Sequence, residues 1–192
     1  MKIKRICLIL VSVYYLFAFH SFAADETHFP KPNLQPSWCK YAGKLIFDNN
    51  VPAVDDEDEV GVFVKDNNGN DICIGSCVIG KTYPGYFYVS VYGDDPKTTD
   101  IKEGAYEQEN LLFKVWDRNK CKEYTVFNIS SNSFSGMELP SVPPIYVETR
   151  QFAELNLYVS TDDDDNILPG DINKNCRLDI KDIIEILTNL SN

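Results

Sequence analysis

The sequence contains very little histidine, which limits the chemistry that it can support. Two histidines occur among 192 residues, and only His28 lies beyond the first 23 residues. Hydrolases with a Ser-His or Cys-His pair, and most catalytic zinc sites, need histidine at the reacting centre. The chain also lacks a Cys-x-x-Cys pair, and we expect no Gly-rich phosphate loop. We therefore expect a protein that is not an enzyme and that has no zinc site.

Basic residues are also scarce relative to acidic ones. Lys and Arg total 18 against 29 Asp and Glu, which gives a formal net charge of −11. Proteins that bind nucleic acid or anionic lipid surfaces need clustered basic side chains to neutralise phosphate. We therefore expect no nucleic-acid partner, whereas divalent cations are compatible with this charge.

Only one long apolar run is present, over residues 6–19. Basic residues precede it, and Ser21 and Ala23 follow it at the spacing of a signal-peptidase site. We predict a signal peptide over residues 1–23 and a flexible N-terminal segment over residues 24–37. The mature chain would then be exported to the extracellular space, the cell surface or the periplasm, and it would not span a membrane after cleavage.

The remaining cysteines are few, and their pairing stays open. Five follow the signal segment: Cys39, Cys73, Cys77, Cys121 and Cys176. An oxidising compartment allows up to two disulfides among them. Cys73 and Cys77 lie in one apparent strand, where a separation of roughly 13 Å would prevent them from bonding to each other. Either they pair with other cysteines, or a turn at Gly75 brings them together.

Residues 38–160 have the pattern of a mainly β domain. Eight short apolar or alternating runs are separated by turn signals such as "DNNGN" and "GDD": "YAGKLIF", "EVGVFV", "ICIGSCVI", "GYFYVSVYG", "LLFKVWD", "KEYTVF", "PIYVE" and "ELNLYV". This pattern predicts an antiparallel β-sandwich or open barrel with a single core. Residues 161–169 contain four consecutive aspartates and are predicted to form an acidic linker.

Alternation along two of these strands predicts an aromatic outer surface. In "GYFYVSVYG", Phe87, Val89 and Val91 share one face, and the tyrosines occupy the other. The same reasoning places Trp116 opposite the aliphatic side chains of "LLFKVWD". Exposed rings of this kind stack on sugars or on apolar partners, although ordinary cross-strand pairing also accounts for them. The candidate ligand-binding residues are Tyr86, Tyr88, Tyr92 and Trp116.

The C-terminal stretch "GDINKNCRLDIKDIIEILTNL", residues 170–190, carries oxygen ligands at the spacing of a calcium loop. Counting from Asp171, places one, three, five, nine and twelve bear oxygen side chains, and place seven contributes a backbone carbonyl. Ile183, Ile184 and Leu187 then recur at helical spacing, and Asp182 is positioned to cap that helix. The candidate Ca²⁺ ligands are Asp171, Asn173, Asn175, Arg177, Asp179 and Asp182.

This stretch resembles a type I dockerin repeat, whose usual form is close to GDxNxDGxVDxxDxxxLxxxL. By that resemblance the five oxygen side chains bind calcium, and the partner is a cohesin-like or other cell-surface protein. The sequence departs from the family at Cys176, which replaces the glycine of the sharp turn, and at Asn175, which replaces an aspartate. Both changes predict weaker binding. A complete dockerin has two such repeats, and this chain shows one.

The preceding domain resembles a module that recurs in secreted bacterial proteins. The residues that carry the resemblance are "DEVGVFV", "CIGSCVI", "GDDPKT" and "FKVWD". The resemblance implies an immunoglobulin-like or transthyretin-like sandwich and supplies no catalytic residues. The sequence therefore predicts an exported, non-catalytic, calcium-binding structural or protein-interaction module. The alternative is a carbohydrate-binding accessory protein of an extracellular polysaccharide-degrading system.

Overall fold

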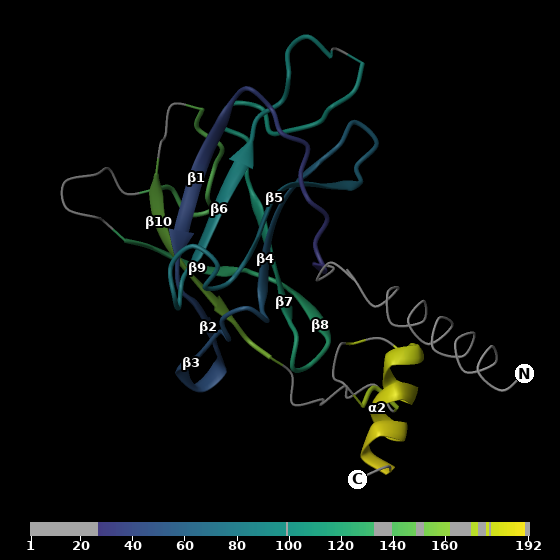
Figure 1. Ribbon diagram of the computed structural model, residues 1–192. Coiled ribbons are helices and arrows are strands. Elements are labelled where there is room, and N and C mark those ends of the chain that lie inside the picture. Colours follow the sequence, from purple (N-terminus) through teal and green to yellow (C-terminus); the bar gives the residue numbers. More distant parts are fainter. Residues whose placement is uncertain are drawn as a thin grey trace, which may run out of the picture.

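The computed structural model describes residues 27–98, 100–132, 140–148, 152–161, 170–172, 176 and 178–190. It contains two β-sheets that pack face to face, followed by one C-terminal helix (Figure 1). The predicted fold class, a mainly β sandwich with a short C-terminal helix, is confirmed.

The first sheet has strand order β3-β2-β10-β1-β6, with β9 paired to the other edge of β10. Its strands are β1 (Trp38–Gly43), β2 (Leu45–Phe47), β3 (Val51–Pro52), β6 (Phe87–Tyr92), β9 (Asn128–Asn132) and β10 (Ala153–Val159), with a short 3-10 turn η1 (Asp48–Asn50) before β3. Strand β10 runs parallel to β1 and β2, which differs from the purely antiparallel pairing that the sequence predicted. Gly43 permits this close approach, because a Cβ there would lie 1.5 Å from the carbonyl oxygen of Leu155.

The second sheet has strand order β5-β4-β7-β8, and all of its pairs are antiparallel. Its strands are β4 (Glu59–Lys65), β5 (Asp71–Val78), β7 (Leu112–Asp117) and β8 (Lys122–Thr125). The pairing of β4 with β5 shifts register at Val62/Phe63, because Val62 pairs with Gly75 and Phe63 with Cys73, which leaves Ile74 as the extra residue of a bulge in β5. The predicted strand "PIYVE" is wrong: Ile145 makes only an isolated bridge to Asn110, since Pro143 and Pro144 lack the N–H groups that a ladder requires.

The core lies between the sheets and follows the period-two alternation of the strands. The β6 side chains Phe87, Val89 and Val91 are fully buried, as are Phe113 and Val115 of β7. Their partners from β10 and β4 complete one continuous cluster. The predicted inward faces of these two strands are therefore confirmed, and the alternating tyrosines and Trp116 lie on outer faces.

An N-terminal strap, residues 27–30, packs on the outer face of the second sheet. Both oxygens of the Glu59 carboxylate accept backbone N–H bonds, from His28 at 2.8 Å and from Phe29 at 3.2 Å. Phe29 is 2% exposed and meets Phe63 edge to face. This segment was expected to be flexible, and that expectation is wrong for the strap, because it covers apolar side chains that the outer face of β4 would otherwise expose.

The C-terminal helix α2 (Ile180–Leu190) lies beyond the end of the sandwich near the β7–β8 turn (Figure 1). Asp182 is its one buried residue. Among the described residues, no helix is both long and apolar enough to cross a lipid bilayer.

Candidate functional site

The C-terminal loop begins and ends with a carboxylate, Asp171 at the first of its twelve places and Asp182 at the last. Both side chains are buried, at 8% and 4% exposure. One oxygen of Asp171 accepts the N–H of Cys176 at 2.7 Å, and one oxygen of Asp182 accepts the N–H of Ile172 at 2.8 Å. Each carboxylate thus bonds to the backbone of its own loop, which closes the chain around them.

Helix α2 begins with a reciprocal capping arrangement. The Asp179 carboxylate accepts the N–H of Lys181 at 2.7 Å, and the Asp182 carboxylate accepts the N–H of Asp179 at 2.9 Å. This is the geometry of a capping box, which satisfies amide groups that have no partner within the helix. The prediction that Asp182 caps the helix is confirmed, and Asp179 is the N-cap residue itself.

Three of the six predicted calcium ligands, Asn173, Asn175 and Arg177, lie outside the described residues. The other three, Asp171, Asp179 and Asp182, are all held within one short loop by the bonds given above. Carboxylate oxygens are the ligands that Ca²⁺ prefers. Asp171, Asp179 and Asp182 therefore offer oxygen atoms of the type that a hard cation takes.

Cys176 occupies the turn of this loop in a left-handed conformation, with φ of 65°. Glycine adopts that conformation without steric cost, whereas a residue with a Cβ pays roughly 1–2 kcal/mol. The loop therefore keeps the sharp turn that the dockerin pattern assigns to glycine, even though the residue is cysteine.

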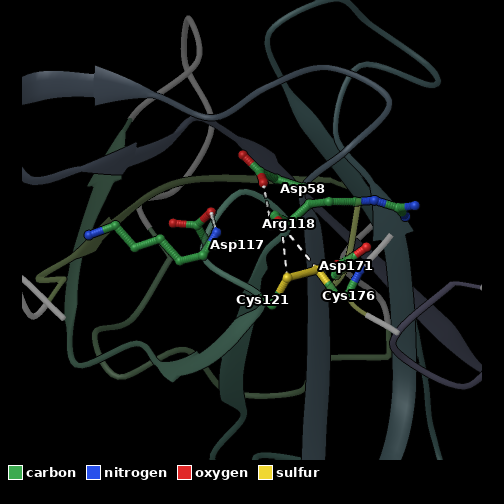
Figure 2. Close-up of a disulfide and its surroundings, with 7 residues drawn as sticks. Asp58, Asp117, Arg118, Cys121, Asp171 and Cys176 are labelled. Atoms are coloured by element: carbon green, nitrogen blue, oxygen red, sulfur yellow. Dashed lines mark hydrogen bonds between the residues drawn. A yellow bond between two sulfur atoms is a disulfide. The ribbon is translucent and has the colours of Figure 1, made fainter. Parts of the chain in front are cut away.

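A disulfide joins Cys176 to Cys121, which lies in the turn between β7 and β8 (Figure 2). The Cα atoms are 5.3 Å apart across a sequence separation of 55 residues. A cross-link over that separation stabilises the folded chain by about 4 kcal/mol in the chain-entropy treatment. The sequence left this pairing open, and the tail is covalently bound to the sandwich rather than attached by the acidic linker alone.

The turn that carries Cys121 is itself anchored to the sandwich. Arg118 donates its N–H to Asp58 at 3.0 Å, and its carbonyl oxygen accepts the N–H of Cys121 at 3.3 Å. The same carbonyl lies 3.1 Å from the Sγ of Cys176, as Figure 2 shows. Burial raises the pKa of Asp58 to about 6, although bonds from Val54 and Arg118 oppose that shift. The sandwich side of the disulfide is therefore held by backbone hydrogen bonds.

The two sulfur atoms and the Asp171 carboxylate also lie within 4.8 Å of one another. Such a grouping suits a soft metal only when the cysteines are thiolates. Here the sulfurs are bonded to each other, so this grouping offers no pair of thiolates to a metal ion.

The apolar side chains of α2 face solvent. Ile183, Ile184 and Leu187 are 53%, 47% and 61% exposed. These three side chains were predicted to dock on the sandwich or on a partner protein, and they do not pack into the core of the sandwich. The helix thus presents an apolar surface beside the C-terminal loop.

A second site is an aromatic groove on the first sheet. Its volume is about 510 Å³ and its surface is mainly apolar; it is lined by Ala42, Gly43, Tyr83, Tyr86, Tyr88, Phe152 and Glu154. Tyr83 and Tyr86 belong to the turn before β6 and are 56% and 37% exposed. The Lys44 ammonium lies 5.3 Å from the centre of the Tyr86 ring. The groove therefore combines aromatic faces with charged groups at its edge.

Tyr88 stabilises this groove through ring contacts of its own. Its ring meets Tyr83 edge to face at 5.7 Å and stacks near Phe152 at 6.3 Å. Cross-strand aromatic pairing, the alternative considered from the sequence, thus accounts for part of the surface. Tyr83 and Phe152 were missed because neither lies on the alternating face of a predicted strand.

The predicted four-residue aromatic surface is not continuous. Tyr86 and Tyr88 line the groove, whereas Tyr92 lies at the other end of β6, paired with Trp38 of β1. Trp116 belongs to the opposite sheet, and the His28 ring stacks on it at a centroid distance of 3.8 Å. Alternation predicts the face of a strand but not the sheet that the strand joins.

A phosphate-loop spacing, "GSCVIGKT" at residues 75–82, is present although none was expected. A phosphate loop requires a strand, a loop of free amides and then a helix. In this structure Gly75 to Val78 continue strand β5, Gly80 donates its N–H to Tyr86, and Lys81 pairs with Asp56 at 2.7 Å. Strand β6 follows rather than a helix, so the motif does not form a phosphate site.

The free thiols of β5 do not have the character of nucleophiles. Burial raises the pKa of Cys77 to about 12 and also raises the pKa of Cys73. Reactive cysteines have a lowered thiol pKa. Cys73 instead lies beside the N-terminal strap, 3.4 Å from the carbonyl oxygen of Pro30. These two residues therefore have a packing role.

Comparison with known proteins identifies no relative by sequence. No protein-family model matches the chain, and no curated protein matches it. Among solved structures, a 9R-lipoxygenase from Cyanothece PCC8801 is similar over 77% of this chain at 15% identity and a TM-score of 0.36, and this chain spans 20% of its length.

Two further solved structures show likeness of the same order. The dioxygenase domain of a dioxygenase carbohydrate-binding protein fusion from Streptomyces sp. SirexAA-E is similar over 72% of this chain and 97% of its own, at 10% identity and a TM-score of 0.37. An alternative pilotin of the type II secretion system of Vibrio cholerae is similar over 63% of this chain and 96% of its own, at 10% identity and a TM-score of 0.28. At these TM-scores, none of the three supports an argument about fold or function.

Proposed function

We propose that this protein is an exported, non-catalytic module whose C-terminal loop binds Ca²⁺. The observation that carries the proposal is the pair of buried carboxylates, Asp171 and Asp182, held in one loop around a left-handed turn. Calcium would supply positive charge to these groups and order the loop. The residues that would hold it are Asp171, Asn173, Asn175, Asp179 and Asp182, with the backbone carbonyl of Arg177.

Calcium in this module has a structural role and supports an interaction. The loop leads directly into α2, whose isoleucine and leucine side chains are exposed. An exposed apolar helix face of this kind suits a protein partner. The partner class we propose is a cohesin-like or other cell-surface protein, outside the cell or in the periplasm.

A calorimetric titration of the purified chain with Ca²⁺ tests the proposal. We expect one site per chain, with a Kd of order 10 µM or weaker, and no binding in an Asp171→Ala, Asp179→Ala double variant. An Asp56→Ala, Asp95→Ala double variant removes the same charge from exposed turns and should bind as the parent does. A parent chain that gives no heat and no calcium-dependent rise in melting temperature would overturn the proposal.

The aromatic groove supports a second candidate function, carbohydrate binding as an accessory to extracellular polysaccharide degradation. The specific observation is that the exposed rings of Tyr83 and Tyr86 flank a groove with Lys44 and Glu154 at its edges. Aromatic faces stack on the apolar faces of sugar rings, while charged and polar groups bond to hydroxyls. Phe152 supplies a further ring to the lining of the groove.

Binding to insoluble polysaccharides and to a panel of soluble glycans tests this second candidate. A Tyr83→Ala, Tyr86→Ala variant should bind at least about tenfold more weakly than the parent, a difference of about 1.4 kcal/mol. Tyr92→Ala is the matched control, since Tyr92 is on the same sheet face but outside the groove. Absence of binding across the panel would leave the calcium module as the only function.

A further inference from the structure

We propose that the Cys121–Cys176 disulfide is a positioning element of the calcium loop, so that its reduction weakens calcium binding. By thermodynamic reciprocity, bound calcium then makes the disulfide harder to reduce. The inference rests on the calcium site proposed above. It adds that the calcium affinity of that site depends on the redox state of the disulfide, and that Cys121 of the sandwich holds the loop in position.

Cys176 lies at the left-handed turn of the loop. Its N–H donates to Asp171 at 2.7 Å, and Cys176 makes this bond from a left-handed backbone with φ of 65°. A reduced cysteine would have no covalent restraint on that conformation and would favour the ordinary extended or helical regions. The turn would then open in part of the population, and the Asp171 carboxylate would lose its place in the loop.

The other end of the disulfide, Cys121, is held in place by the sandwich. Cys121 lies in the turn after β7, which is bound through Arg118 to the buried Asp58 carboxylate. The covalent bond therefore ties the strained residue of the loop to a fixed point on the sandwich. Reduction would break this covalent tie between the loop and the sandwich.

The redox step is an ordinary thiol–disulfide exchange with a dithiol reductant. One thiolate of the reductant attacks one sulfur of the pair, and the S–S bond breaks with formation of a mixed disulfide. The second thiolate of the reductant then displaces the remaining protein sulfur. Two electrons and two protons pass to Cys121 and Cys176, which become thiols, and the dithiol becomes a disulfide.

The size of the coupling follows from the conformational preference of residue 176. The cost of the left-handed region to a residue with a Cβ corresponds to about a tenfold change in an equilibrium constant. We therefore expect calcium affinity to fall about tenfold on reduction. Saturating calcium should lower the reduction potential of the disulfide by about 30 mV, which is that tenfold factor for two electrons.

The experiment measures calcium affinity by calorimetry in the air-oxidised chain and in the chain reduced with dithiothreitol. A Cys121→Ser variant removes the disulfide without reductant and should bind as weakly as the reduced parent. Adding Cys176→Gly to that variant should restore most of the affinity, because glycine adopts the left-handed turn without a disulfide. Cys73→Ser is the matched control and should not change the redox dependence. The disulfide potential is measured in the same chains by equilibration with dithiothreitol, with and without calcium.

Each outcome separates this inference from the calcium site itself. Weaker binding on reduction, rescue by Cys176→Gly and a calcium-dependent potential support the inference. Equal calcium affinity in oxidised and reduced chains would overturn it and leave the calcium site intact. If the oxidised chain binds no calcium, both proposals fail. A peptide map that lacks the Cys121–Cys176 cross-link would overturn the inference alone, as would loss of affinity without rescue by glycine.

Discussion

Replacing Phe29 by alanine tests whether the N-terminal strap is part of the folded domain. The Phe29 ring is 2% exposed and packs against Phe63 at a centroid distance of 5.6 Å. It also lies over Gly61, where an added Cβ would come within 3.0 Å of the ring. Truncation of such a buried phenylalanine costs about 3–5 kcal/mol. We expect a loss near the lower value, because the strap can detach and so relieve part of the cavity.

Urea unfolding measures this loss, and tryptophan fluorescence reports where it occurs. In a Trp38→Phe background, emission comes from Trp116, which His28 covers at 3.8 Å. Detachment of the strap should shift that emission to longer wavelength before the global transition. Phe127→Ala is the control, because that ring is 87% exposed and its removal should change stability by less than about 0.5 kcal/mol. A Phe29→Ala variant that matches the Phe127→Ala control would refute the reasoning.

Two further changes probe the sandwich. Gly43→Ala places a Cβ 1.5 Å from the carbonyl oxygen of Leu155, so β1 and β10 must separate. We expect the free energy of unfolding in urea to fall by more than about 3 kcal/mol. Gly69→Ala is the control: its Cβ meets no atom within 4 Å, and the change should cost only about 1 kcal/mol for the left-handed backbone. Burial raises the pKa of Asp58 from 3.8 to about 6, so its neutral form stabilises the fold fully below pH 4, and this contribution is lost as the pH rises through 6. Relative to Asp58→Asn, the parent should therefore lose about 2 kcal/mol of stability between pH 4 and pH 7, and a pH-independent difference would contradict the raised pKa.

Part of the candidate site could be predicted because it is local in sequence. The proposed calcium loop and its helix span 21 residues, from Gly170 to Leu190, and the capping of α2 by Asp179 and Asp182 uses residues three apart. Interactions over such short separations depend on spacing, which a sequence displays directly. The left-handed turn at Cys176 follows from the same spacing, although the residue itself argued against it.

The sequence by itself determined which side of each strand faces the core. Period-two alternation placed Phe87, Val89 and Val91 inside, because successive side chains of a strand point to opposite faces. It also indicated a mainly β fold with one terminal helix. These features depend on each segment alone and needed no knowledge of its neighbours.

Only the tertiary structure decided which distant segments meet. Trp116 lies on the sheet opposite Tyr86, the strap covers it, and Cys121 bonds to Cys176 across 55 residues. These contacts are chosen by how two amphipathic sheets bury their apolar faces and by which loops then lie close together. The pattern of residues along the chain does not specify these contacts, since many pairings of the same strands satisfy the same alternation.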